Sequence, residues 1–362
     1  ADSGAVYVFE RTGLDWAEQA KLLALDGAPL DRFGEAVAIS HDTIAVGAPQ
    51  DDDLGSKTGA VYVYVETAGV WALEAKLLPS DGAGGDEFGS SVDIEGDLIL
   101  VGAPGHDLAG VGSDVGAAYA FERSGTAWTE VVKLVPSDPG ARSLFGASVA
   151  ITGEDQGHAE HADNRIIVGA PQDSDVVPFG GSAYVFSELA GAWSEEVKLT
   201  DANAADNDLF GTAVDLFDGL AVVGSPGDDD FVLDGGSIFA FEEDQHVWSQ
   251  TQHKVGPFPT NPNRLLGSSV AITHGTVLAG APMEDVEGST EAGEMYIWFT
   301  EEVAWEVEVS VADDPVVGAH LGISVAASGC WMVAGADRDD ELGPDSGAVF
   351  IYPANHHMDS YC

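Results

Sequence analysis

Residues 33–77 read FGEAVAISHDTIAVGAPQDDDLGSKTGAVYVYVETAGVWALEAKL. Four segments of this stretch are apolar, β-branched or aromatic, and each has the length of a strand rather than of a helix. They cover residues 36–39, 43–46, 60–64 and 71–77. Gly47, Ala48 and Pro49 end the second segment, because proline cannot donate to a strand ladder and glycine permits a tight bend. The stretch therefore predicts four antiparallel strands joined by turns.

The same pattern recurs along the chain of 362 residues. A glycine opens the third segment of each unit, and successive glycines are 55, 57, 65, 55, 57 and 54 residues apart: Gly4, Gly59, Gly116, Gly181, Gly236, Gly293 and Gly347. One such unit is too small to bury its own apolar face, so the units must pack on one another. No low-complexity linker interrupts the array. We predict a single domain over residues 1–362, with a short tail at 353–362.

Four-stranded antiparallel units with periodic glycines and aromatic residues are typical of β-propeller blades. We predict an all-β propeller of six blades, with seven as the alternative, because six first segments occur: Phe33, Phe88, Phe145, Phe210, Leu266 and Leu321 begin them. The third segment occurs seven times, so the chain starts and ends within a blade. The segment at 16–22 is expected to complete the blade begun at Leu321, which would close the propeller with a blade shared by the two termini.

The charge of the chain is extreme, with 62 acidic residues against 13 lysines and arginines and a net charge of −49. Nucleic acid and anionic membranes are unfavourable partners, because phosphate binding needs clustered basic residues. No run of eighteen apolar residues occurs, so no membrane insertion is expected. Acidic surfaces suit water rich in salt or divalent ions. We therefore expect a secreted or cell-surface protein, and a monomer.

Two cysteines, Cys330 and Cys362, lie in the last repeat and at the end of the sequence. A disulfide between them would attach the tail to the last unit and stabilise the fold by roughly 3 to 4 kcal/mol. Disulfides persist mainly in exported proteins, which favours the bond. Two free thiols are the alternative.

The recurring Phe-Gly and Gly-Ala-Pro pairs resemble FG-GAP repeats, which build the propeller of integrin α subunits and of many bacterial surface and secreted proteins. The pairs are Phe33-Gly34 with Gly47-Ala48-Pro49, Phe88-Gly89 with Gly102-Ala103-Pro104, Phe145-Gly146 with Gly169-Ala170-Pro171, and Phe210-Gly211 with Gly224-Ser225-Pro226. The resemblance covers nearly the whole chain and weakens at Leu266, Leu321 and Asp337. It implies a binding or adhesion module without enzymatic activity.

The resemblance also implies calcium sites in DxDxDG loops between the first and second strands. This chain departs from that pattern, since its turns read Ser40-His41-Asp42, Glu95-Gly96-Asp97, Phe217-Asp218-Gly219 and Thr273-His274-Gly275. Such turns are too short and too poor in carboxylates to supply six to eight oxygens. The integrin-type calcium sites are therefore not transferred to this sequence.

A different set of loops, those after the second strand, is rich in carboxylates. We predict that these loops bind calcium or a protein or glycan ligand, because hard cations take clustered carboxylate oxygens. The candidate ligands are Asp51, Asp53, Asp173, Asp175, Asp228, Asp230, Asp337 and Asp339. The alternative is that these residues only form turns and solvate the protein.

The third repeat is longer than the others because its first turn is enlarged, with fifteen positions from Ile151 to Ile166. This turn contains His158, His161 and Asp163, residue types that bind zinc or other transition metals. An exposed polar loop without a metal is the alternative.

No catalytic motif occurs, neither a nucleophile elbow, nor HExxH, nor a phosphate-binding Gly-Lys-Ser/Thr loop. A tryptophan recurs at one position of every unit and indicates blade packing rather than sugar stacking: Trp16, Trp71, Trp128, Trp193, Trp248 and Trp305. The alternative to a binding module is a hydrolase or lyase with its active site at the axial opening of the propeller. Such an enzyme needs two or three groups that converge from unlike repeats.

Overall fold

A computed structural model describes residues 3–13, 15–152, 164–256, 262–273, 275–286, 288–299, 305–310, 316–329, 331–340, 343 and 346–353. Every regular element in these ranges is a β-strand. This part of the chain contains no helix that could cross a membrane.

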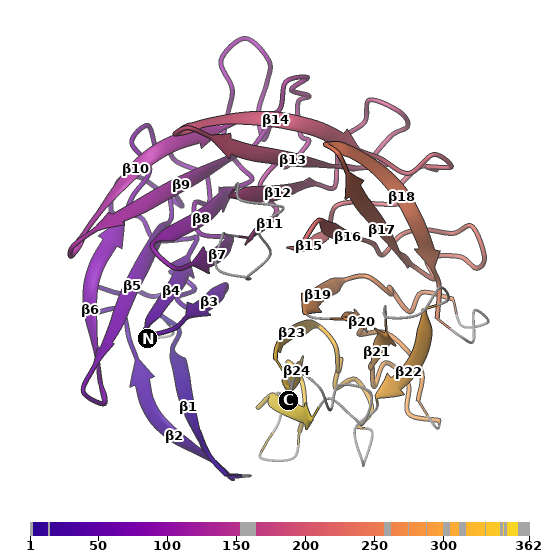
Figure 1. The fold of residues 1–362 in the computed structure, drawn as a ribbon. Coiled ribbons are helices and arrows are strands. Elements are labelled where there is room, and N and C mark those ends of the chain that lie inside the picture. The colour runs from indigo at the N-terminus through magenta and orange to yellow at the C-terminus, as the bar shows by residue number, and fades with distance from the viewer. Residues whose placement is uncertain are drawn as a thin grey trace. The chain divides into compact units, whose positions relative to one another are not determined.

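The strands form antiparallel sheets in chain order (Figure 1). Blade 1 comprises β3 (Val37–Ser40), β4 (Thr43–Ala48), β5 (Ala60–Thr67) and β6 (Val70–Leu77). Blade 2 comprises β7 (Ser91–Glu95), β8 (Leu98–Ala103), β9 (Ala117–Ser124) and β10 (Ala127–Leu134). Blade 3 comprises β11 (Ser148–Thr152), β12 (Arg165–Ala170), β13 (Ser182–Leu189) and β14 (Ala192–Leu199). Blade 4 comprises β15 (Ala213–Phe217), β16 (Leu220–Ser225), β17 (Ser237–Asp244) and β18 (Val247–Lys254). Blade 5 comprises β19 (Ser269–Thr273), β20 (Thr276–Ala281), β21 (Glu294–Phe299) and β22 (Glu306–Ser310).

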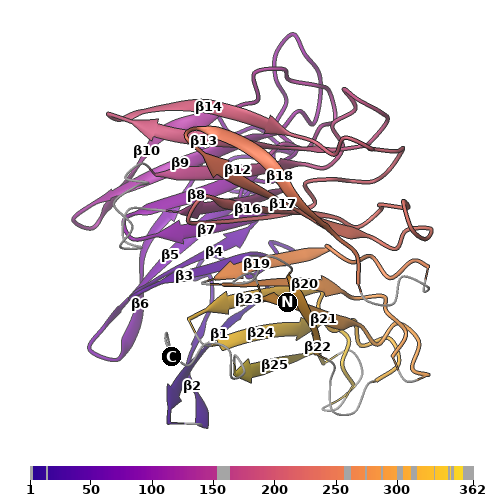
Figure 2. The same cartoon turned by 45° about the vertical axis from the view of Figure 1, so that its right-hand side comes forward.

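The two ends of the chain supply shorter sheets. Blade 6 contains β23 (Ser324–Ser328), β24 (Trp331–Ala336) and β25 (Ala348–Pro353), and β25 lies beside β24 in Figure 2. Near the N-terminus β1 (Val6–Thr12) pairs with β2 (Asp15–Leu22) as a hairpin. The predicted β-propeller class is confirmed, with six first strands that begin six blades rather than seven. The blade shared by the two termini stays a prediction.

The described strands fall into two compact units. The first contains β1 to β12, the second contains β15 to β25, and β13 and β14 are divided between them. The hypothesis of a single domain over residues 1–362 stays a prediction. Cys330 and Cys362, with the predicted disulfide, lie outside the described residues, as do His158, His161 and Asp163.

The second and third strands of each blade form its core. All six residues of β4 and the first five of β5 are buried, whereas burial alternates along β7 and much of β10. The second strand of blade 1 continues to Ala48, two residues beyond the end of the predicted segment, and Pro49 follows it. A continuous apolar run is expected for strands that are covered on both faces.

The aromatic residue that opens a blade packs between that blade and the preceding one. Phe88 is fully buried and belongs to one apolar cluster with Val61 of blade 1 and with Tyr119 and Phe121 of blade 2. Gly59 forms an isolated bridge with Phe88 and has φ of 85°, and an added Cβ there would overlap the Phe88 carbonyl oxygen. Phe88 therefore packs as a wedge between the two blades, and a glycine is required opposite it.

A half-buried carboxylate also links neighbouring blades through their first strands. Asp215 accepts hydrogen bonds from the N–H groups of Leu216 in its own strand and of Ile272 in blade 5, both at about 2.8 Å or less. Asp93 makes the same pair of contacts with Ile94 and Ile151. Burial raises the pKa of Asp215 to about 7, although the two N–H donors oppose the shift. Both oxygens of this carboxyl are therefore engaged in holding two blades together.

Candidate functional site

The loop after the second strand is closed in the same way in blades 1, 2, 4, 5 and 6. In blade 1 the N–H of Gly59 donates to the Asp51 carbonyl at 2.9 Å, and the Asp51 side chain accepts the N–H of Asp53 at 3.2 Å. Aspartate forms such turns readily because its short side chain bonds to backbone two residues ahead. The turn directs the carboxylates of Asp51 and Asp53 toward the third and fourth strands of their own blade.

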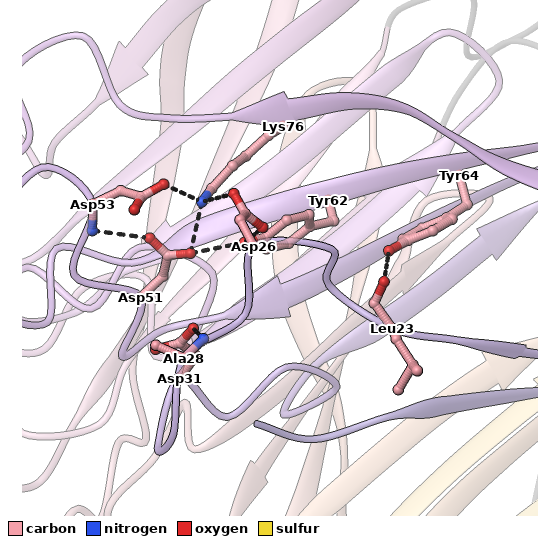
Figure 3. A network of polar contacts seen from close by, with 9 residues as sticks. All are labelled: Leu23, Asp26, Ala28, Asp31, Asp51, Asp53, Tyr62, Tyr64 and Lys76. Carbon is pink, nitrogen blue, oxygen red and sulfur yellow. Dashed lines mark hydrogen bonds and ion pairs between the residues drawn. The ribbon is translucent and has the colours of Figure 1, made fainter. Parts of the chain in front are cut away.

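A lysine of the fourth strand fills the space between these carboxylates (Figure 3). The ammonium group of Lys76 lies 2.8 Å from Asp51, 2.5 Å from Asp53 and 2.9 Å from Asp26. It also lies 4.9 Å from the centre of the Tyr62 ring, which is a cation–π distance. We call this arrangement of loop carboxylates, third-strand aromatic residue and fourth-strand cation the loop site of a blade.

The hydrogen bonds of the loop site match the charges of its groups. The Tyr62 hydroxyl oxygen lies 2.8 Å from a carboxylate oxygen of Asp26 and 2.8 Å from one of Asp51. The two carboxylates therefore share the one proton that the hydroxyl can donate. Burial opposes the charge on Lys76, but its contacts with Asp51 and Asp53 outweigh burial and raise its pKa. Burial likewise opposes the charge on Asp26, but its bond with Lys76 lowers the pKa overall. Lys76 and Asp26 therefore stay ionised.

Blades 2 and 3 repeat this arrangement with small changes. Lys133 lies 2.6 Å from Asp81 and 5.4 Å from the centre of the Tyr119 ring, and its Nζ contacts His106 Nε2 at 2.7 Å. His106 holds the position of Asp51 and contacts Asp86 at 3.1 Å. In blade 3, Lys198 lies 2.8 Å from Asp175 and 5.3 Å from the centre of the Tyr184 ring.

Blade 4 differs because a histidine replaces the lysine. His253 stacks on Phe239 with ring centres 4.3 Å apart, and its Nε2 lies 3.0 Å from Asp228. Burial lowers the basicity of the imidazole, but the bond with Asp228 outweighs burial and raises the pKa of His253. Three possible ligand atoms lie within 4.8 Å of one another: a carboxylate oxygen of Asp228, a carboxylate oxygen of Asp230 and a ring nitrogen of His253. Among the described residues this is the one group that meets a geometric criterion for a metal site.

Blades 5 and 6 instead contain an arginine and a histidine from the loop before the first strand. In blade 5, Arg264 is 1% exposed, lies 3.9 Å from Glu284 and sits 6.0 Å from the centre of the Tyr296 ring. In blade 6, His320 Nδ1 lies 3.1 Å from Asp337.

The structure brings together some of the predicted ligands and separates others. Asp51 and Asp53 meet at Lys76, and Asp228 and Asp230 meet at His253. Asp175 contacts Lys198, while Asp173 is buried in the same loop. Asp339 is buried and its carbonyl accepts the N–H of Gly347, so it holds the position of Asp51, whereas Asp337 holds the position of Pro49. Asp337 and Asp339 therefore do not correspond to Asp51 and Asp53.

A family model of the FG-GAP repeat matches residues 16–64, 71–121, 128–186, 193–241 and 306–352. The chain belongs to the FG-GAP repeat family. Each match begins near the tryptophan of a fourth strand and ends in the third strand of the next blade. A search of curated proteins found no match.

The turns in which the FG-GAP resemblance implies calcium are tight in this member of the family. β3 ends at Ser40 and β4 begins at Thr43, and β15 and β16 are separated by Asp218 and Gly219 alone. The candidate site of this FG-GAP chain therefore lies in the loops after the second strand.

The recurring lysine was missed as a member of the site, although the sequence contains a signal for it. Four of the lysines occupy one repeat position in a chain that is otherwise acidic: Lys21, Lys76, Lys133 and Lys198. Tyr62 and Lys76 are cross-strand partners in adjacent strands. Cross-strand partners point to the same side of a sheet, so the pairing follows once the strand register is known.

Proposed function

We propose that this FG-GAP chain is a non-enzymatic extracellular binding and adhesion module whose loop sites bind a basic segment of a protein partner. The observation that carries this proposal is the loop site of blade 1, where three carboxylates hold one ammonium group at 2.5 to 2.9 Å over a tyrosine ring. The chemistry that binds Lys76 suits a lysine or arginine of another protein equally well.

Carboxylates remain for such a partner after the internal cations are paired. Asp52 and Asp229 are exposed beside the paired residues in the loops of blades 1 and 4. The net charge of −49 steers a basic partner toward the chain and repels nucleic acid. A neutral glycan gains nothing from this charge, so we favour a protein. The extracellular location rests on the family, whose repeats are typical of extracellular and surface proteins.

Calcium enters the proposal as a competitor of the basic segment. Calcium takes carboxylate oxygens and tolerates irregular geometry. We propose that it binds the exposed loop carboxylates weakly and thereby reduces the affinity for the partner. The hydrolase or lyase alternative is not proposed, because no observation on the described residues favours it.

The test measures binding of a lysine- and arginine-rich peptide by calorimetry, with a glutamate-rich peptide of equal length as control. We expect binding of the basic peptide alone, weaker at high salt and in millimolar calcium. Asp229→Asn should weaken binding more than Asp244→Asn, which removes the same charge from the exposed turn at the other end of blade 4. Equal effects of the two substitutions, or binding that salt leaves unchanged, would show that the loop carboxylates are not the binding surface.

A further inference from the structure

The loop site of blade 4 lacks two side chains that neutralise the site in blade 1. His253 replaces the lysine, and Phe239 replaces the tyrosine whose hydroxyl bridges two carboxylates. The imidazole reaches one carboxylate, that of Asp228, and the Ser237 hydroxyl, each at 3.0 Å. Lys76 reaches three carboxylates in the equivalent position. Blade 4 therefore has fewer donors for its acidic groups.

The carboxylates of blade 4 are nonetheless numerous and deeply buried. Asp201 is 4% exposed, Asp208 is 3% exposed and Asp228 is 4% exposed. Asp230 adds a fourth carboxylate at the exposed side of the loop. Like charges that are brought together in a medium of low dielectric repel one another strongly. Such a group needs a further positive charge.

One buried oxygen in this group has no hydrogen-bond partner among the residues that the structure describes. Asp208 accepts the N–H of Ala205 through Oδ2, while Oδ1 is buried and makes no hydrogen bond. Burial, together with the charges of Asp228 and Asp201, raises the pKa of Asp208 to about 6, although the N–H of Ala205 opposes the shift. An ionised buried oxygen without a donor is costly. The Asp208 carboxylate is therefore suited to interact with a cation, or to accept a hydrogen bond from a water molecule that is bound to a cation.

The repeat shows where the Asp208 carboxylate points. Its backbone carbonyl accepts the N–H of Gly227 and the hydroxyl of Ser225, which places Asp208 beside the residues that lead to Asp228. In blade 2 the equivalent carboxylate, Asp86, contacts His106, which occupies the position of Asp228. The Asp208 side chain consequently lies on the side of its loop that faces the cluster of Asp228, Asp230 and His253.

We propose that the loop site of blade 4 binds one divalent transition-metal ion of the zinc or cobalt type, through one carboxylate oxygen each of Asp228 and Asp230 and through Nε2 of His253. Asp208 supplies negative charge behind these ligands and accepts a hydrogen bond from a metal-bound water. The proposal goes beyond the binding of a basic partner and does not depend on it.

The ligand set selects the class of metal. Imidazole nitrogen suits zinc, copper, iron and nickel, whereas calcium and magnesium prefer oxygen alone. Three protein ligands with an open position are the usual arrangement when a fourth ligand comes from solvent or from a partner. Asp230 is exposed, so solvent can reach the site. Phe231, which meets His253 edge-on at 5.9 Å, borders the site on the same loop.

The experiment titrates cobalt into untagged protein that has been freed of metal by a chelator. We expect saturation at one cobalt per chain with a visible absorption band, and displacement of cobalt by zinc but not by an equal amount of calcium. Absence of saturable binding, or displacement by equimolar calcium, would overturn the proposal.

Three variants assign the binding to this site. His253→Lys restores the lysine that blades 1 to 3 contain, so the fold should persist while the cobalt band is lost. Asp230→Asn changes an exposed residue and should also abolish saturation at low cobalt, and Asp208→Asn should weaken binding by about tenfold. Lys76→His is the matched control, because it places a histidine at the position of blade 1 that is equivalent to His253. Cobalt binding that persists undiminished in His253→Lys or in Asp230→Asn would place the metal elsewhere and contradict the proposal.

Discussion

The loop sites of blades 1 and 4 share a backbone and differ in the side chains that face the carboxylates. Gly59 closes the first loop on Asp51 at 2.9 Å, and Gly236 closes the other on Asp228 at 3.0 Å. The first loop then holds Lys76 in contact with three carboxylates, whereas the second holds His253 in contact with one.

The difference shows how one repeat supports two roles. A lysine fixed among carboxylates completes its site, and the blade gains a polar network that needs no outside partner. A histidine in the same position leaves negative charge uncompensated and offers a nitrogen that can bind a metal. The variation between blades, rather than the common pattern, is therefore the basis on which we propose an ion site in blade 4.

The largest expected effect concerns what the two blades have in common. Phe33 packs edge-on against Tyr62 with ring centres 5.4 Å apart, and Phe210 packs in the same way against Phe239 at 5.3 Å. Replacing either by alanine should lower the free energy of unfolding by about 3–5 kcal/mol, because each is buried to 2% exposure or less. Urea denaturation measures the change.

Phe231→Ala is the control for these two variants, since Phe231 is 62% exposed and its loss should change stability by about 0.5 kcal/mol or less. A small effect of Phe33→Ala beside a large effect of Phe210→Ala would show that the two blades are not equivalent scaffolds.

The next effect concerns the lysine that completes blade 1. Lys76→Met leaves the carboxylates of Asp51 and Asp26 without their cation, so we expect a loss of about 2–4 kcal/mol in urea denaturation. Lys57→Met is the matched control, because Lys57 and Glu87 form an exposed pair at 3.9 Å that contributes less than about 1 kcal/mol. Similar losses in the two variants would mean that the network of blade 1 is no stronger than a surface ion pair.

A third prediction uses a position in the first strands, where blade 1 has Ala38 and blade 4 has Asp215. The pKa of Asp215 is raised from 3.8 to about 7 by burial, so the folded chain binds this proton more tightly than the unfolded chain. The resulting stabilisation is fully present at pH values below the pKa of Asp215 in the unfolded chain. It is lost as the pH rises through the pKa in the folded chain, by at most about 1.4 kcal/mol per pH unit.

Asp215→Asn should remove this contribution, so the free energy of unfolding should depend less on pH between those two values than in the unchanged protein. Asp244→Asn, at an exposed turn of the same blade, should leave the slope intact. An unchanged slope in Asp215→Asn would mean that the two N–H donors keep the carboxylate ionised throughout.

The fold could be predicted from the sequence because its signals are local and repeated. The strands of blade 1 follow from short apolar segments bounded by glycine and proline, and the number of blades follows from the recurring Phe-Gly or Leu-Gly pair that begins each first segment. The predicted Asp51 and Asp53 do converge, because an aspartate turn directs both side chains to one side.

The cations of the loop sites depend on contacts that no local pattern encodes. Lys76 is twenty-five positions from Asp51, and only the register of β5 with β6 brings the two together. The last loop misled the prediction in a different way, since Asp337 replaces a proline and shifts the apparent motif by two residues relative to Asp339. Asp208 was not predicted, because its lack of a partner is a property of packing.

The smallest expected effect on stability gives the sharpest contrast between the two blades. Asp53 and Asp230 occupy the same loop position and both are exposed. Without metal, Asp53→Asn and Asp230→Asn should each change the free energy of unfolding by less than about 1 kcal/mol, because exposed ionic contacts contribute little. With saturating cobalt, the unchanged protein and Asp53→Asn should both gain in melting temperature, since a ligand that binds only the folded state stabilises it. Asp230→Asn should not gain, because it lacks one of the three ligands. Equal gains in the two variants would show that His253 gives the loop of blade 4 no metal binding beyond that of the loop of blade 1.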